Sequence, residues 1–521
     1  MNLLETFDSL LQQWRAVFSQ ERTFERARRL TFGLLSCLRM HLTSTAICAS
    51  GRQFQDWSAD YRVCARSPWE PRQLFDVVLD HLPGLLPSAQ APVLVAIDDT
   101  ILKKTSRRIP GVKVLRDPMS LPFHVNFCYG LRFVQVSALV SPRHAAGPAR
   151  ALPVRFDFAP PANKPKKNAG NEAWENYKEE QKKRRLSLAG VAALSSLRAS
   201  LDQRSDTSQR QLIVCGDGSY TNRTVMRSLP ERTTYLGRLR KDAKLYYPLP
   251  EASAKTTGRP RRYGPAAPTP EQILKDDAVE IVKVRCFAAG QLREFSVKVL
   301  GNVTWRKSGT DMPVQIVVVK PVGYRLRNGS KLLYRSPAFL ICTDPQLDLA
   351  TLLQAYIDRW QIECNHRDEK SLLGVAQGQV WNPNSVRRLP QLQVAGYSLL
   401  LLASILSSGF QRTGEYLPLP KWRRKSIRPS LLDLLALVRD QIFSAAVAAP
   451  VLHFDDFANI SSPAAKLQKQ PLASETLCTL AACNFTTRLL AFSQMANLQT
   501  PLLAALQAST SEWMPSRSFR C

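Results

Sequence analysis

The stretch PVLVAIDDT, residues 92–100, decides the fold, because it is a short apolar run that ends in two carboxylates. Such a run is typical of a central strand that is buried on both faces. A second run of this kind, QLIVCGDGSY at 211–220, also ends in an acid. We therefore predict that Asp98 and Asp99 follow one strand and Asp217 another, at the sheet edge where α/β proteins build their sites.

The sequence around these runs predicts further strands and helices. Residues 1–90 have mostly helical patterns. FHVNFCYGLRFVQVSALV (123–140) predicts two strands that meet at a turn at Tyr129 and Gly130, and LPVRFDF (152–158) predicts another. β-like segments alternate with polar turns over 233–345. Together these patterns predict an α/β protein.

A helix is predicted for YIDRWQIECNHRDEK, residues 356–370, and its charges have a preferred side. Tyr356, Arg359, Glu363 and Lys370 fall within an arc of about 60° on a helical wheel. A stripe of this kind is typical of a solvated surface with ion pairs, or of a surface that meets a charged partner. The stripe alone does not decide between these two interpretations.

The carboxylates become informative when they are taken together. Asp217 alone fits a turn, since GDG is a common turn string, and Asp98 and Asp99 alone fit a strand end. Carboxylates gathered in one place repel one another unless a hard cation lies between them, and Mg²⁺ prefers such oxygen ligands. Two Mg²⁺ ions can clamp the attacking and leaving oxygens of a phosphoryl displacement.

Composition points to a polyanionic partner. Lys and Arg number 71 against 42 Asp and Glu, a formal net charge of +29. Nucleic acid is the first candidate and a membrane surface the second. No secretory signal is visible, and the apolar stretch at 394–410 predicts a buried core helix. Eleven scattered cysteines without metal-ligand spacing fit reduced thiols, so we expect a cytoplasmic protein.

The spacing Tyr356-x2-Arg359-x3-Glu363-x6-Lys370 resembles the Tyr–Arg–Glu–Lys signature of bacterial insertion-sequence transposases of the DDE type. AIDDT and VCGDGSY resemble the two aspartate segments of that family, in the same order. The resemblance implies catalytic, metal-binding roles for Asp217 and Glu363, and for Asp99, which precedes a Thr as in the family. Asp98 remains the alternative, because strand alternation does not decide between two buried faces.

The same resemblance implies the organisation of the chain. An RNase H-like mixed sheet with flanking helices would be interrupted by a β-rich insertion and joined by helical N- and C-terminal regions. The expected boundaries are 1–90 for a DNA-binding helical region, 91–232 and 338–410 for the two parts of the catalytic core, 233–337 for the insertion, and 411–521 for the helical C-terminal region.

The activity implied is cut-and-paste transposition of an insertion sequence. Tyr356, Arg359 and Lys370 would hold DNA phosphates, and two Mg²⁺ ions, replaceable by Mn²⁺, would serve as cofactors. Double-stranded DNA, as terminal inverted repeats and target, and a second copy in a homodimer would be the partners, in a bacterial cytoplasm beside the nucleoid. The alternatives are an endonuclease without strand transfer and a catalytically idle DNA-binding descendant.

Several weaker patterns carry expectations of their own. Lys103 and Lys104 follow the first acids and are candidates to neutralise DNA phosphates. His366, next to the acidic site on the helix, could act in proton transfer, but a surface position is expected for it. Trp305 is expected to pack among strands. TGRPRR (257–262) reads as a plain basic loop, and KWRRK (421–425) as either a solvated linker or a backbone-tracking segment.

Overall fold

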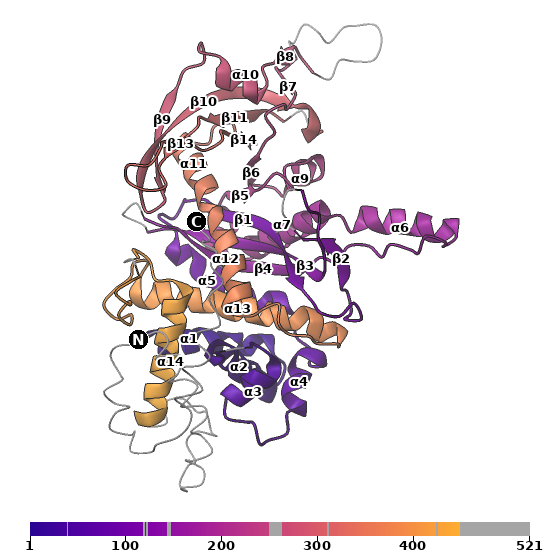
Figure 1. The fold of residues 1–521 in the computed structure, drawn as a ribbon, viewed down its shortest axis with the longest axis vertical. Coiled ribbons are helices and arrows are strands. Elements are labelled where there is room, and N and C mark those ends of the chain that lie inside the picture. Colours follow the sequence, from indigo (N-terminus) through magenta and orange to yellow (C-terminus); the bar gives the residue numbers. More distant parts are fainter. Residues whose placement is uncertain are drawn as a thin grey trace.

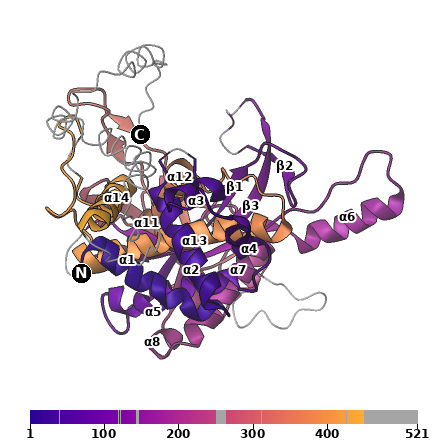
Figure 2. The same ribbon diagram turned by 90° about the horizontal axis from the view of Figure 1, so that it is seen from below.

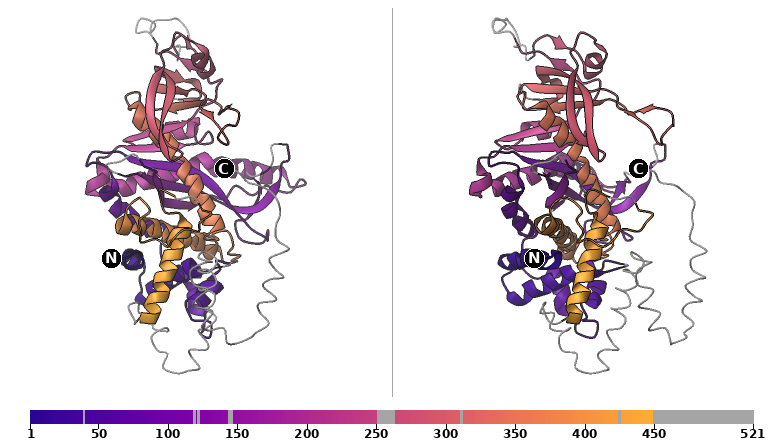
Figure 3. Two further views of the ribbon diagram at one scale, coloured as in Figure 1. Left: turned by 60° about the vertical axis from the view of Figure 1, so that its left-hand side comes forward. Right: turned by 90° about the vertical axis from the view of Figure 1, so that its left-hand side faces the viewer.

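The structure is a computed structural model that describes residues 1–448 except 39, 118–119, 121–122, 143–146, 250–262, 310–311 and 424–425. It is elongated, with a mixed sheet in the middle, a β-rich region at one end and a helical region at the other (Figure 1). Two further views show the same three-part arrangement from the side (Figure 3). The predicted α/β class with a large mixed sheet is therefore confirmed.

Helices make up the N-terminal region, as the sequence predicts. They are α1 (Leu3–Gln12), α2 (Glu21–Ser36), α3 (Thr43–Ala49), α4 (Ser58–Ala65) and α5 (Asp76–Leu85), with 3-10 turns η1 (Gln13–Val17) and η2 (Pro71–Phe75). Asn2 and Glu5 form a capping box that starts α1. Phe7 and Phe32 meet edge to face at 5.4 Å between ring centroids, which joins α1 to α2.

Five strands form the middle of the sheet in the order β4-β3-β1-β5-β6. They are β1 (Val93–Lys103), β3 (Phe127–Val140), β4 (Arg150–Phe158), β5 (Leu212–Gly216) and β6 (Thr233–Arg238). The short strand β2 (Lys113–Arg116) pairs with the first residues of β3, 127–130. The contacts of β3 with β1 and β4 are antiparallel, while β5 is parallel to both β1 and β6.

One strand prediction is wrong. Residues 127–140 form the single strand β3, without a turn at Tyr129 and Gly130. A Cβ atom at Gly130 would lie 2.5 Å from Cγ2 of Ile101 on β1, so the glycine permits close packing between neighbouring strands. The glycine that predicted a turn therefore serves the close packing of β3 against β1.

Strands also dominate the segment between β6 and the later helices, and they extend the same sheet. Its strands are β14 (Ala338–Cys342), β11 (Val314–Val319), β10 (Gln291–Trp305), β9 (Val282–Ala288), β7 (Leu245–Tyr246) and β8 (Ala266–Ala267), with β12 (Gly323–Tyr324) and β13 (Leu333–Tyr334) as a separate pair. Two short helical turns accompany them, α10 (Pro270–Lys275) and η4 (Arg306–Ser308). Because β14 pairs with β6, the sheet of twelve strands is continuous.

Helices cover both faces of the central strands. α7 (Leu186–Asp202) lies on one face, with the short α8 (Ser205–Ser208) and α9 (Arg223–Arg227) nearby. α11 (Leu349–Asp358) and α12 (Trp360–Ser371) lie on the other (Figure 1). α6 (Asn171–Lys183) projects away from the body and buries none of its residues (Figure 2).

The long helix α13 (Pro383–Ser408) runs between the sheet and the N-terminal helices, and α14 (Leu431–Ala448) packs beside it. α13 is long and apolar enough to span a bilayer, but it is almost entirely buried inside the protein. The prediction of a core helix in this region is therefore confirmed. Of the C-terminal region expected to be helical, the part after residue 448 lies outside the described residues.

Candidate active site

Two aspartates lie at the same level on neighbouring strands. In the parallel pair of β1 and β5, Ile97 is opposite Gly216, so the next residues, Asp98 and Asp217, are also level with each other. Asp217 follows β5 as predicted, but the prediction that Asp98 and Asp99 follow their strand is wrong, because β1 continues past both to Lys103 through its pairing with β3. The structure nevertheless brings the two predicted aspartate segments together.

The neighbours of each strand show which face its acid lies on. On β5, Ile213 and Cys215 pack in a cluster with residues of α11, and strand alternation places Asp217 on that same face. On β1, Leu94 and Ala96 pack with Ile362 of α12. Alternation along β1 then places Asp98 on the face that α11 and α12 cover.

Asp99 belongs to the opposite face of β1. Val95 and Ile97 share its face, and Cδ1 of Ile97 approaches Gly190 of α7. The pairing of β1 with β3 runs without a bulge from Val95 to Lys103, so the alternation is not interrupted between the two acids. The sequence favoured Asp99, but the helix with the third predicted acid lies on the side of Asp98.

Glu363 is supplied by α12, next to the buried anchor Ile362. Its Oε1 accepts a hydrogen bond from Nη2 of Arg359 at 3.0 Å. One turn later, Nε2 of His366 lies 3.9 Å from Oδ2 of Asp98. Burial raises the pKa of Glu363, and the charge of Asp98 raises it further. The helix and β1 therefore share one electrostatic site.

Burial and mutual repulsion also act on the aspartates. The pKa of Asp98 is raised by burial and by Asp217, while His366 opposes the rise. Burial, with the charges of Asp98 and Asp217, raises the pKa of Asp99 to about 6. A nearby cation would favour the charged forms of these carboxyl groups and oppose the rise in pKa.

The donor atoms fit a hard divalent cation, although the side chains are engaged elsewhere. Asp217 accepts hydrogen bonds from the backbone N–H of Ser219 at 2.9 Å and from its hydroxyl at 2.8 Å, and Glu363 is paired with Arg359. Among the described residues no three His, Cys, Asp or Glu side chains are grouped closely enough to hold a metal. Asp98, Asp217 and Glu363 nevertheless offer only oxygen ligands, the type that Mg²⁺ prefers.

The remaining residues of the predicted stripe surround Glu363. Tyr356 lies on α11, and Arg359 is the junction residue between α11 and α12. The Arg359 guanidinium lies 5.6 Å from the centre of the Tyr356 ring. Lys370 is near the end of α12, where burial lowers its pKa while Glu369 and Asp98 raise it. Cations thus flank the carboxylates on both sides along the helix.

His366 was expected on the surface, and that expectation is wrong. The residue is only 8% exposed, and its Nδ1 lies 3.4 Å from Oε2 of the fully buried Glu369. Asn365 extends this polar layer by accepting from the Tyr397 hydroxyl at 3.1 Å. The spacing of three residues between Glu363 and His366 places both on one helix face, and this signal could have identified the histidine.

The lysines after the first acids have structural partners. Lys104 is buried and donates to the carbonyls of Ala376 at 2.7 Å and Gly378 at 2.6 Å, and burial lowers its pKa to about 8. Lys103 pairs with Asp117. The expectation that Lys104 contacts phosphates is therefore wrong, because its charge is used inside the fold.

Of the three remaining weaker patterns, only Trp305 lies fully within the described chain. Trp305 is 5% exposed and packs in the main core, as predicted. The basic loop at 257–262 lies outside the described residues, and so does part of the segment at 421–425.

Comparison with known proteins identifies the family of the chain. The family of DDE superfamily endonucleases matches residues 15–310, which is more than half of the chain and includes both aspartate segments. The match ends before Glu363 and the charged stripe of α11 and α12. No curated protein matches the chain. With two level acids on adjacent parallel strands, the chain belongs to the family of DDE superfamily endonucleases.

Proposed function

We propose that the protein is a transposase that cuts and joins DNA strands with divalent metal ions, moving an insertion sequence by cut-and-paste transposition. One observation carries the proposal: Asp98 and Asp217 lie level on adjacent parallel strands, and Asp98 is near enough to Glu363 of α12 to raise its pKa. The strand order β4-β3-β1-β5-β6, antiparallel and then parallel, supports an RNase H-like core.

In this proposal Asp98, Asp217 and Glu363 are the catalytic metal ligands, and Asp98 takes the role that the sequence analysis assigns to Asp99. The orientation of β1 supports this choice, because Asp98 shares its face with α12 and Asp99 does not. Bound in a pair, Mg²⁺ or Mn²⁺ ions would stabilise the charge that develops on the attacking and leaving oxygens. Asp217 and Glu363 would exchange their present partners, Ser219 and Arg359, for the cations.

The chain's own cations would position the DNA. Arg359 offers a planar fork of donors to a phosphate once Glu363 turns to the metal, and Lys370 offers a point charge. Tyr356 packs against Arg359 and orients it. His366 would hold Asp98 in place through its ring nitrogen, since it lies between Asp98 and the buried Glu369.

The partners we propose are double-stranded DNA and a second copy of the chain. The net charge of +29 fits a polyanion, and the helices α1 to α5 would recognise the terminal inverted repeats. Joining two element ends to target DNA requires both ends in one complex, which a homodimer provides. A bacterial cytoplasm, at the nucleoid, is the proposed location.

The test is incubation of the purified protein with Mg²⁺ and DNA that carries the flanks of its own gene. Cleavage with joined products supports the transposase, and Asp217→Asn should abolish both. Glu180→Gln, a matched change at an exposed acid paired with Arg184 on the distant α6, should leave them intact. Cleavage without joined products would instead establish an endonuclease, in line with the family description, and binding without cutting would establish an idle DNA-binding protein.

A further inference from the structure

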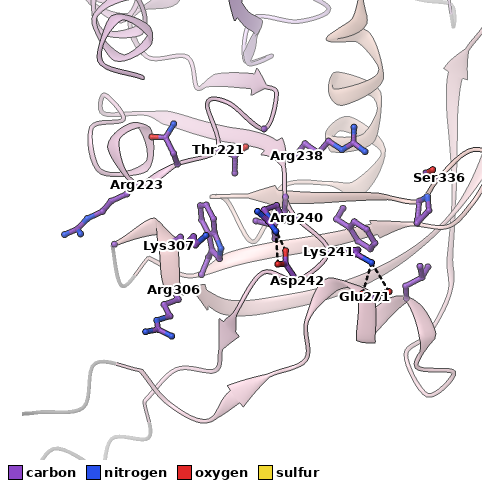
Figure 4. A pocket seen from close by; sticks show the side chains of 18 of the residues that line it. Thr221, Arg223, Arg238, Arg240, Lys241, Asp242, Glu271, Arg306, Lys307 and Ser336 are labelled. Atoms are coloured by element: carbon purple, nitrogen blue, oxygen red, sulfur yellow. Dashed lines mark hydrogen bonds and ion pairs between the residues drawn. The ribbon is translucent and has the colours of Figure 1, made fainter. Parts of the chain in front are cut away.

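A cleft of about 1200 Å³ opens beside Asp217, between the loop after β5 and the β-rich region (Figure 4). Its lining begins at Gly218, the residue directly after Asp217, and continues to Arg223 of α9. The end of β6 and the residues after it, α10, η4 and the segment that leads into β14 line most of the rest. Because the lining starts one residue after Asp217, a strand held in this cleft would lie next to the segment that carries one of the proposed ligands.

Positive charge dominates the rim of the cleft. Two of its cations are neutralised: Arg240 binds Asp242 through two hydrogen bonds of 2.9 Å, and Lys241 lies 3.4 Å from Glu271. In the chain as described, the other four have no carboxylate partner in an ion pair, and all are exposed; they are Arg223, Arg238, Arg306 and Lys307. Four uncompensated cations around one hollow attract a polyanion.

The floor of the cleft is apolar. Leu239, Trp305 and Phe339 line it and are 4%, 5% and 7% exposed, so they lie deeper than the cations of the rim. A duplex exposes phosphates, sugars and the edges of its bases but keeps the base faces stacked inside, so it would leave a recessed apolar floor uncovered. A single strand presents base faces as well as phosphates, and it matches a floor and rim of this composition.

Part of the rim is fixed in place by the fold. Gly309 has φ +69°, and a Cβ atom there would lie 2.6 Å from Nε of Arg223. The glycine therefore lets the chain after η4 pack directly against the Arg223 side chain. This contact joins the segment after Asp217 to the β-rich region, so the fold itself fixes these two sides of the cleft relative to each other.

We propose that this cleft binds a single-stranded stretch of DNA next to the cut, with its phosphates on Arg223, Arg238, Arg306 and Lys307. The inference rests on the proposed function, because the strand bound here is the one that reaches the carboxylates. It adds a binding site that lies outside the charged stripe of α11 and α12.

The experiment measures binding of fluorescent oligothymidylate to the full chain by anisotropy, in EDTA, over a range of salt. Arg238→Ala/Lys307→Ala removes one rim cation at the end of β6 and one in η4, and Lys182→Ala/Lys183→Ala removes two exposed cations from the distant α6. We expect the cleft variant to bind about tenfold more weakly and the log K against log salt slope to fall by about 1.4. The control should change neither quantity, and Arg238→Lys/Lys307→Arg should bind like the wild type.

Equal losses in the cleft variant and the α6 control, or an unchanged slope in the cleft variant, would overturn the inference. So would a cleft variant that loses affinity for a short duplex but not for the single strand. Cutting by the wild type is assayed separately with Mg²⁺. If the wild type cuts and the cleft variant still binds normally, only this inference fails. If the wild type never cuts while the cleft variant loses affinity, the transposase proposal fails and the cleft remains a nucleic-acid site.

Discussion

Asp98 and Asp99 are neighbours in sequence but belong to opposite faces of β1. Asp98 meets His366 and the charge of Glu363, whereas Asp99 shares its face with Ile97, toward α7. Both carboxyls are largely buried and both have a raised pKa, so composition and burial do not separate them. Their orientation does, because a ligand has to face the helix that carries the third acid.

We therefore expect Asp98→Asn to abolish Mg²⁺-dependent DNA cleavage and Asp99→Asn to retain most of it. Replacing one metal ligand removes a negative charge that binds the cation, while a change on the opposite face of β1 leaves the ligands intact. A nicking assay on plasmid DNA measures both variants side by side. The reverse order of activities would return the role of first ligand to Asp99.

The raised pKa of Asp99 also predicts a pH-dependent stability. Near its ordinary pKa of 3.8 the unfolded chain loses this proton, whereas the folded chain keeps it until about pH 6. The folded state therefore loses stability as the pH rises through this window, and above about pH 6 the loss is complete. Asp99→Asn should add on the order of 1–3 kcal/mol at pH 7 and almost nothing at pH 4.

Denaturant unfolding of both proteins at the two pH values measures this difference. The metal is left out of the buffer, because a cation would compensate the carboxylates and reduce the effect. An equal gain at both pH values would mean that the substitution acts through packing rather than through the charge.

At the scale of elements, β1 is tied to the segment that follows α12. Lys104, just beyond the end of β1, donates to the carbonyls of Ala376 and Gly378, which lie between α12 and α13. This pair of hydrogen bonds joins the strand with the first acid to the chain that leaves the helix with the third. The hydrogen bonds of Lys104 thus help to position the carboxylates, in addition to the packing of Ile362.

Lys104→Met should lower the free energy of unfolding by about 1–3 kcal/mol, because it leaves two buried carbonyls without a donor. Lys103→Met removes only an ion pair whose lysine is exposed and should cost about 1 kcal/mol or less. Urea midpoints at neutral pH compare the two variants. A larger effect at Lys103 would contradict the roles assigned here.

The elements differ in how far the sequence predicts them. The runs at 92–100 and 211–220 gave β1 and β5 because apolar runs that end in acids have few other interpretations. The turn predicted at Gly130 is wrong, because the sequence alone does not distinguish a glycine in a turn from one that permits close strand packing. Strand β6 was assigned to the insertion, but its parallel pairing with β5 places it among the central strands. Pairing partners are long-range information that local patterns lack.

The candidate site was predictable to a similar degree. Asp217 and Glu363 lie where their segments predict, and the choice between Asp98 and Asp99 needed the neighbours of each face. The roles of His366 and Lys104 depend on their burial, which the residue type in the sequence does not reveal. The cleft combines residues from the loop after β5, from β6 and from η4, and only the fold brings these together.

At the scale of the whole molecule, we expect that metal binding at Asp98, Asp217 and Glu363 stabilises the folded protein. Three buried or half-buried carboxylates destabilise one another until a cation binds, so Mg²⁺ should raise the melting temperature of the wild type. Asp217→Asn should respond much less, because it lacks one ligand. Thermal scans with and without Mg²⁺, with NaCl at matched ionic strength as the control, measure this. An equal rise in both proteins would show that the ion acts elsewhere.

The unbroken run of hydrogen-bonded strands from β1 through β6 and β14 to β10 has a consequence for where DNA is cut. Each strand in this run pairs with the next, with one register shift between Leu300 and Val303 of β10, so the sheet would keep the proposed cleft beside η4 at a fixed distance from the acids. In the proposed function, the number of nucleotides between the bound phosphates and the cleaved bond would then be set by the protein and not by the DNA sequence.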